Sequence, residues 1–121
     1  MERCAEHNCP TAHKAPGPAP YYAVIFSSTL ADDAAGYGAM ADRMVALARE
    51  QEGFIDVESA VRTSEGFGIT VSYWRDLESI KRWKVQSEHA AAQRMGRDAF
   101  YRSYRLRIAK VERECAFDRG E

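Results

Sequence analysis

Hydrophobic and polar positions along this chain follow two alternating periods, which predict strands and helices in turn. Residues 21–28, YYAVIFSS, are rich in aromatic and β-branched side chains, as is typical of a strand buried on both faces. Apolar residues then recur at helical spacing from Tyr37 to Ala48, and Gly53 supplies a helix stop. We therefore expect the folded domain to open with a strand followed by a helix.

The same two periods predict the remaining elements. Alternation indicates a second strand from Phe54, a third over 67–74 and a fourth over 104–113. Between the last two strands, Asp76 is a suitable N-cap for an amphipathic helix. The apolar face of that helix carries Leu77, Ile80 and Trp83. The predicted order is βαββαβ.

This order is the ferredoxin-like split βαβ pattern, an α+β fold in which both helices cover one face of a four-stranded antiparallel sheet. The other face then needs a cover, and in a short chain the simplest cover is the same face of a second copy. We expect a homodimer whose two sheets enclose a core, a dimeric α+β barrel. Residues 1–20 hold all four prolines and are expected to form a flexible extension, 21–113 the domain and 114–121 a C-terminal tail.

Composition narrows the class of protein. A chain of 121 residues fits one domain, and a net charge of -1 gives no broad attraction for nucleic acid. The sequence contains neither a long apolar run nor a secretory signal pattern, so we expect no membrane partner and a cytoplasmic location. Three cysteines placed near the two ends are an odd number, and we expect them to be reduced thiols.

Three motifs have ordinary explanations. Gly36, Gly38 and Ala41 spell G-x-G-x-x-A, but the first glycine does not directly follow the strand, so a flexible helix start is the better interpretation than a dinucleotide site. Four possible zinc ligands in the extension match no standard spacing; they are Cys4, His7, Cys9 and His13. A basic series is interpreted as a mostly solvated strand face, with one arginine left as a candidate for a pocket; it comprises Arg97, Arg102, Arg105, Arg107, Lys110 and Arg113.

His89 is the leading candidate for catalysis. An imidazole has an unperturbed pKa of about 6.5 and can accept and return a proton near neutral pH. The alternative is a surface residue of a polar helix side. Four aromatic residues are candidates for the wall of an apolar substrate cavity between helix and sheet, the alternative being a filled core; they are Trp83, Tyr73, Tyr22 and Phe26.

Residues 71–89, VSYWRDLESIKRWKVQSEH, together with the βαββαβ order, resemble the antibiotic biosynthesis monooxygenase superfamily, in particular its uncharacterised bacterial stress-type branch. The similarity covers roughly Tyr21 to Arg113. It implies a dimeric α+β barrel. Members include enzymes that oxygenate polycyclic phenols or quinols without metal or flavin, haem-degrading oxygenases, and proteins with no established activity.

The resemblance implies a cofactor-independent monooxygenase acting on a planar aromatic compound of the quinol or anthrone type. His89 would be its base, and Trp83 or an arginine its oxyanion donor. Haem binding by His89 is a second hypothesis, although Phe26, Ser27 and Ser28 stand where the haem-degrading relatives have an Asn. The third hypothesis is a non-catalytic dimeric ligand-binding or stress protein.

Overall fold

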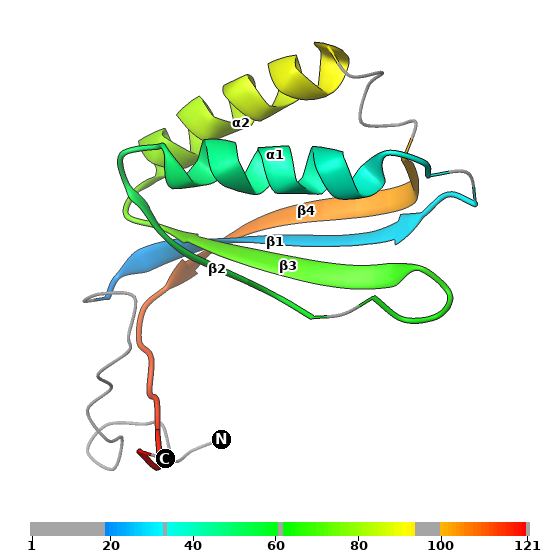
Figure 1. The fold of residues 1–121 in the computed structure, drawn as a ribbon. Coiled ribbons are helices and arrows are strands. Elements are labelled where there is room, and N and C mark those ends of the chain that lie inside the picture. Colours follow the sequence, from blue (N-terminus) through cyan, green and yellow to red (C-terminus); the bar gives the residue numbers. More distant parts are fainter. Residues whose placement is uncertain (1–18, 33, 61, 94–99, 121) are drawn as a thin grey trace.

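Two helices lie over one face of a four-stranded sheet (Figure 1). The computed structural model describes residues 19–32, 34–60, 62–93 and 100–120, without the side chains of 88–93. The elements in chain order are β1 (Tyr21–Leu30), α1 (Tyr37–Arg49), β2 (Phe54–Ser59), β3 (Phe67–Trp74), α2 (Leu77–Gln93) and β4 (Tyr101–Val111).

The sheet has the strand order β2-β3-β1-β4, and every neighbouring pair is antiparallel. The two central strands, β1 and β3, are paired in a continuous register that runs from Tyr22 opposite Trp74 to Thr29 opposite Phe67. This topology confirms the predicted ferredoxin-like α+β fold. The expected bounds shift by a few residues at strand ends: β1 extends to Leu30, and β4 runs from Tyr101 to Val111 instead of over 104–113.

The two faces of the sheet differ in how they are covered. On the helix side, Val24 of β1 and Trp74 of β3 are 2% and 0% exposed and pack with Ala48 of α1 and Ile80 of α2. On the opposite face, Phe67 and Ile69 of β3 are 43% and 42% exposed. Side chains alternate along a strand, so the residues of β3 form two sets on opposite faces. In the single chain, the helices cover the set that includes Trp74 and leave the other set uncovered. Trp74 belongs to the core beneath the helices.

Asp76 begins α2 as predicted. Its carboxylate accepts hydrogen bonds from the backbone N–H of Ser79, at 2.8 Å, and from the Ser79 hydroxyl, at 2.7 Å. Both bonds hold the pKa of Asp76 below its ordinary value, because they stabilise the charged form. The cap satisfies an N–H group in the first turn of the helix, which would otherwise lack a partner.

Gly53 makes the turn between α1 and β2, and its replacement tests the packing of that turn. Its φ is +98°, and a Cβ atom there would lie 2.7 Å from the Cβ of buried Ser79 and closer still to its hydroxyl. We expect Gly53→Ala to lower the free energy of unfolding by about 1–3 kcal/mol or more, because such backbone strain usually costs this much. Gly38→Ala is the control, because a Cβ on Gly38 in α1 meets no atom within 4 Å. It should be neutral or stabilising by up to about 1 kcal/mol. Urea unfolding measures both, and equal losses would contradict the prediction.

Two expectations concern the ends of the chain. Cys115 is disulfide-bonded, so the prediction of three reduced thiols is wrong at this residue. The proline-containing extension lies outside the described residues, apart from Ala19 and Pro20. Among the helices of the described part, none has the length and apolar character needed to cross a membrane.

Candidate functional site

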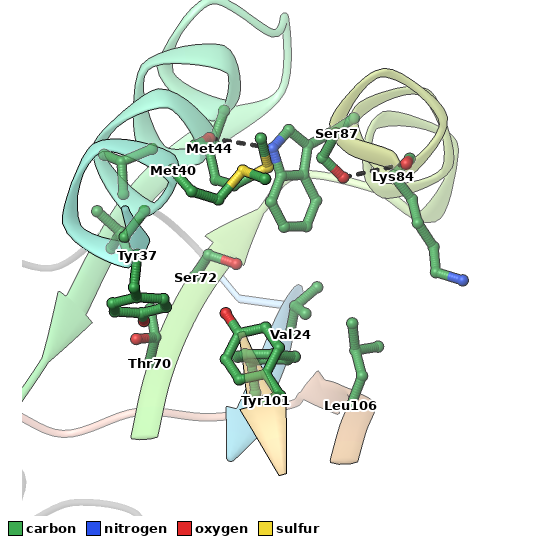
Figure 2. A pocket seen from close by; sticks show the side chains of 16 residues that line it. Val24, Tyr37, Met40, Met44, Thr70, Ser72, Lys84, Ser87, Tyr101 and Leu106 are labelled. Atoms are coloured by element: carbon green, nitrogen blue, oxygen red, sulfur yellow. Dashed lines mark hydrogen bonds between the residues drawn. The ribbon is translucent and has the colours of Figure 1, made fainter. Parts of the chain in front are cut away.

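A cavity of about 140 Å³ lies between the two helices and the sheet (Figure 2). Its floor comes from the middle of the sheet, where Val24 pairs with Ser72 and Phe26 pairs with Thr70. Its roof comes from the facing sides of α1 and α2. The remaining lining residues are Tyr37, Met40, Ala41, Met44, Val45, Ala48, Val57, Trp83, Lys84, Ser87, Tyr101 and Leu106.

Trp83 forms one wall of this cavity from α2. Its ring packs against that of Trp74 with centroids 5.3 Å apart, and its indole N–H donates to the carbonyl oxygen of Met44 on α1 at 3.4 Å. Phe26 contributes from β1 and contacts the ring of Tyr101 edge-on at 5.4 Å. The structure therefore brings together two of the four aromatic candidates, Trp83 and Phe26.

The polar groups of the cavity are mainly hydroxyls. The hydroxyl groups of Ser72 and Tyr101 point into the space between helices and sheet (Figure 2). Ser72 Oγ also accepts the Trp74 indole N–H at 2.9 Å, and Ser87 Oγ donates to the Lys84 carbonyl at 3.0 Å. A mostly apolar wall with a few hydroxyls suits a small apolar ligand that carries one or two oxygen atoms.

Arg62 contacts the lining residue Tyr37. Its guanidinium donates to the hydroxyls of Tyr37, at 3.0 Å, and Ser28, at 2.7 Å, and to the carbonyl oxygens of Ser28, at 3.1 Å, and Gly66, at 2.6 Å. Its Cζ also lies 5.0 Å from the Tyr37 ring centroid. A Cβ at residue 68 would lie 2.8 Å from Arg62 Cγ, so Gly68 provides the space in which this side chain crosses β3. The sequence gives no motif for Arg62; a glycine inside a strand, which often marks a close approach, is the one signal.

Two aromatic candidates do not line the cavity. Tyr22 faces the helices but packs against the core beside Trp74, its register partner. Tyr73 lies on the opposite face of the sheet, because it alternates with two residues that face the helices. There its ring contacts Tyr21 edge-on at 5.9 Å, and its hydroxyl donates to Glu58 at 2.8 Å. Burial and this hydrogen bond raise the pKa of Tyr73 to about 12, so it stays protonated at neutral pH. Both residues are removed from the expected cavity wall.

His89 lies in α2, but its side chain is outside the described residues, so its role stays a prediction. The four possible zinc ligands of the extension also lie outside the described residues, and the described part holds no cluster of metal-binding side chains. Within that same part, no member of the basic series lines the cavity.

A sequence profile of the antibiotic biosynthesis monooxygenase family matches residues 20–95, more than half of the chain. The chain belongs to the antibiotic biosynthesis monooxygenase family. The resemblance seen in residues 71–89 is thereby confirmed at the level of the family.

Two related sequences and two solved structures are similar to this chain. Uncharacterized protein YqjZ of Bacillus subtilis is 52% identical over 104 residues, which cover 86% of this chain and 90% of that protein. The jasmonate monooxygenase ABM of Pyricularia oryzae is 34% identical over 61 residues, 50% of this chain but 28% of that protein. The solved structure of SnoaB, a cofactor-independent oxygenase from Streptomyces nogalater, superposes with a TM-score of 0.63 at 17% identity over 79% of this chain and 97% of that one. PA3566 from Pseudomonas aeruginosa gives 0.62 at 19% identity, over 80% and 97%. The two structures show the shared fold.

The size of the cavity bears on which ligands the described residues can hold. Sites for drug-sized ligands are about 300–1,000 Å³, whereas an engineered apolar cavity of about 150 Å³ in another protein binds benzene. The 140 Å³ found here corresponds to the smaller case. The part of the cavity that the described residues form is therefore large enough for a single aromatic ring.

Proposed function

We propose that this protein is a cofactor-independent monooxygenase whose substrate is a small, single-ring phenol or quinol. The observation that carries the proposal is the mostly apolar cavity of about 140 Å³, with a few hydroxyl groups in its wall, in a chain of this family. The volume favours one ring over the polycyclic compounds that the resemblance suggests. SnoaB, described as a cofactor-independent oxygenase, supports the reaction class.

The reaction needs no redox group from the protein. A phenol that loses its proton becomes an electron-rich anion, and this anion can pass electrons to dioxygen. When the carbon para to the hydroxyl carries hydrogen, one oxygen atom adds there and the other leaves as water, so phenol and dioxygen give a para-quinone and water. The protein must supply a proton acceptor, a donor for the oxyanion and a site that excludes water. The mostly apolar wall of the cavity favours the last of these.

His89 is our proposed proton acceptor. Its imidazole has the appropriate ordinary pKa, and it lies on the helix that brings Trp83 and Ser87 to the cavity. A proposed cytoplasmic location, where phenolic metabolites and dioxygen are both available, is consistent with this role.

Oxygen uptake tests the activity and the base together. We expect the wild-type protein to consume dioxygen with a single-ring phenol that has a free para position, and more slowly with anthrone. His89→Ala should lower the rate by about 10²–10⁴, the usual contribution of a general base. Gln86→Ala, an exposed position on the same helix, is the control and should change nothing. Uptake unaffected in His89→Ala would remove His89 from the mechanism, and ligand binding without any uptake would favour a non-catalytic binding protein.

We also propose that the protein is a homodimer formed through the uncovered face of the sheet. Apolar side chains occupy the middle of this face, including Phe67 and Ile69. Exposed acidic residues, Asp56 and Glu58, lie on one edge strand, and exposed basic residues lie on the other. The basic pair is Arg105 and Arg107, opposite Ser27 and Ile25 of β1. A two-fold axis parallel to the strands would place the acidic edge of each copy against the basic edge of the other.

A further inference from the structure

We infer that Tyr37, held and polarised by Arg62, is the group that recognises the oxyanion of the bound substrate. The inference rests on the proposed function, since it assigns the oxyanion end of the same cavity. Tyr37 is the residue that touches the ligand, and Arg62 is a positioning residue that acts through it.

The hydrogen-bonding capacity of Tyr37 supports this role. A tyrosine hydroxyl has one O–H donor and can also accept. The contact with Arg62 uses the accepting side, at 3.0 Å, because a guanidinium only donates. Among the hydrogen bonds of the described residues none uses the O–H of Tyr37, a residue that lines the cavity, so this group can donate to a ligand. Chains of hydrogen bonds strengthen one another, so the donor from Arg62 makes this O–H a better donor.

Arg62 is held firmly enough to orient its partner. Its guanidinium donates to four oxygen atoms on three segments: Ser28 Oγ and O on β1, Gly66 O in the β2–β3 turn, and Tyr37 Oη on α1. Those four acceptors are neutral. Among the ion pairs seen in the described part of the chain, none involves Arg62. A partly buried cation surrounded by neutral acceptors leaves a positive potential at the Tyr37 end of the cavity.

The titratable residues that line the cavity act in the same direction. Among the described lining residues they are Tyr37, Lys84 and Tyr101, and none of these described residues is a carboxylate. Lys84 lies at the rim, with its ammonium group directed away from the centre (Figure 2). The Arg62 guanidinium beside Tyr37, together with hydroxyl groups in the described wall, favours the phenolate form of a bound phenol over the neutral form.

The optical titration of bound 4-nitrophenol tests this inference without turnover. The dye has a single ring, and its phenolate absorbs at longer wavelength than the neutral phenol. In the wild-type protein, the bound dye should ionise at a lower pH than the free dye. Tyr37→Phe should weaken phenolate binding by about tenfold or more, the effect of losing a hydrogen bond to a charged group. Tyr104→Phe is the matched control, since Tyr104 also loses a phenol hydroxyl but does not line the cavity.

Arg62→Met separates the positioning role from a purely structural one. It should weaken phenolate binding more than binding of the neutral dye, whereas Arg75→Met, an exposed arginine near Asp76, should affect neither. Thermal unfolding of each variant shows whether it is folded, and Tyr37→Phe keeps the ring on which Arg62 lies. The inference is overturned if the dye does not bind or binds only in its neutral form. It is also overturned if the dye bound to Tyr37→Phe ionises at the same pH as the dye bound to the wild type. Phenolate binding without oxygen uptake would refute the proposed oxygenase and leave this inference standing. Oxygen uptake by the wild type, with phenolate binding unchanged in Tyr37→Phe, would refute this inference and leave the oxygenase standing.

Discussion

Ala41→Leu is expected to abolish the binding of single-ring phenols and the oxygen uptake that depends on it. Ala41 lines the cavity from α1, so the added isopropyl group enters a space of about 140 Å³ that has room for one ring. Binding is measured by titration with 4-nitrophenol, and turnover with an oxygen electrode. The effect should be a loss of at least about tenfold in affinity, because the ligand and the leucine side chain compete for the same volume.

Ala46→Leu provides the matched control for this change. Ala46 lies on the same helix but is exposed, so the same substitution adds an apolar group to the surface and leaves the cavity unaltered. Overpacking a core costs about 1–3 kcal/mol, and a cavity that accepts the new side chain should cost less. Ala41→Leu should therefore stay folded in thermal unfolding. If it binds the phenol as well as Ala46→Leu does, the site lies elsewhere on the protein.

The sequence predicts the fold better than it predicts the cavity. Alternation and helical spacing depend on local geometry, and they identified all six elements, with errors of a few residues at the ends of β1 and β4. They also placed Tyr73 and Trp74 on opposite faces of one strand. The period alone does not say which of the two faces the helices, and that choice decides whether Tyr73 is a cavity residue. The structure decides it through Trp74, which is fully buried.

The end of the cavity at Arg62 depends on contacts between distant residues. Arg62 follows β2, whereas its partners Ser28 and Tyr37 belong to β1 and α1. These contacts require the β2–β3 hairpin to lie beside β1, so no local sequence pattern predicts them. Gly68 is required at the crossing point, but a glycine within a strand has several explanations. The difference between a filled aromatic core and a cavity is equally hidden, because both use the same residue types.

Ile69→Lys is expected to convert the proposed dimer to a monomer. Ile69 is 42% exposed in the single chain and lies on the uncovered face of the sheet, where a second copy would bury it. On dimerisation the ammonium group of a lysine there would move from water into an apolar interface. The two-fold axis would bury two such charges. We expect the dissociation constant to rise by about a hundredfold or more, which sedimentation velocity over a range of concentrations measures. Val85→Lys is the control, because Val85 is 64% exposed on α2, away from this face.

Charge reversal then tests how the two copies are oriented. If the two-fold axis runs parallel to the strands, Asp56 of one copy approaches the basic edge of the other, which carries Arg107. Asp56→Lys and Arg107→Glu should each weaken the dimer, because each places like charges opposite one another. The double variant restores the opposite signs and should recover most of the affinity. Additive weakening in the double variant would contradict this axis, and a wild-type protein that stays monomeric at high concentration would contradict the dimer itself. An axis perpendicular to the strands would instead bring like edges together, so the charge pattern of this face selects one of the two ways in which its apolar centre can be covered.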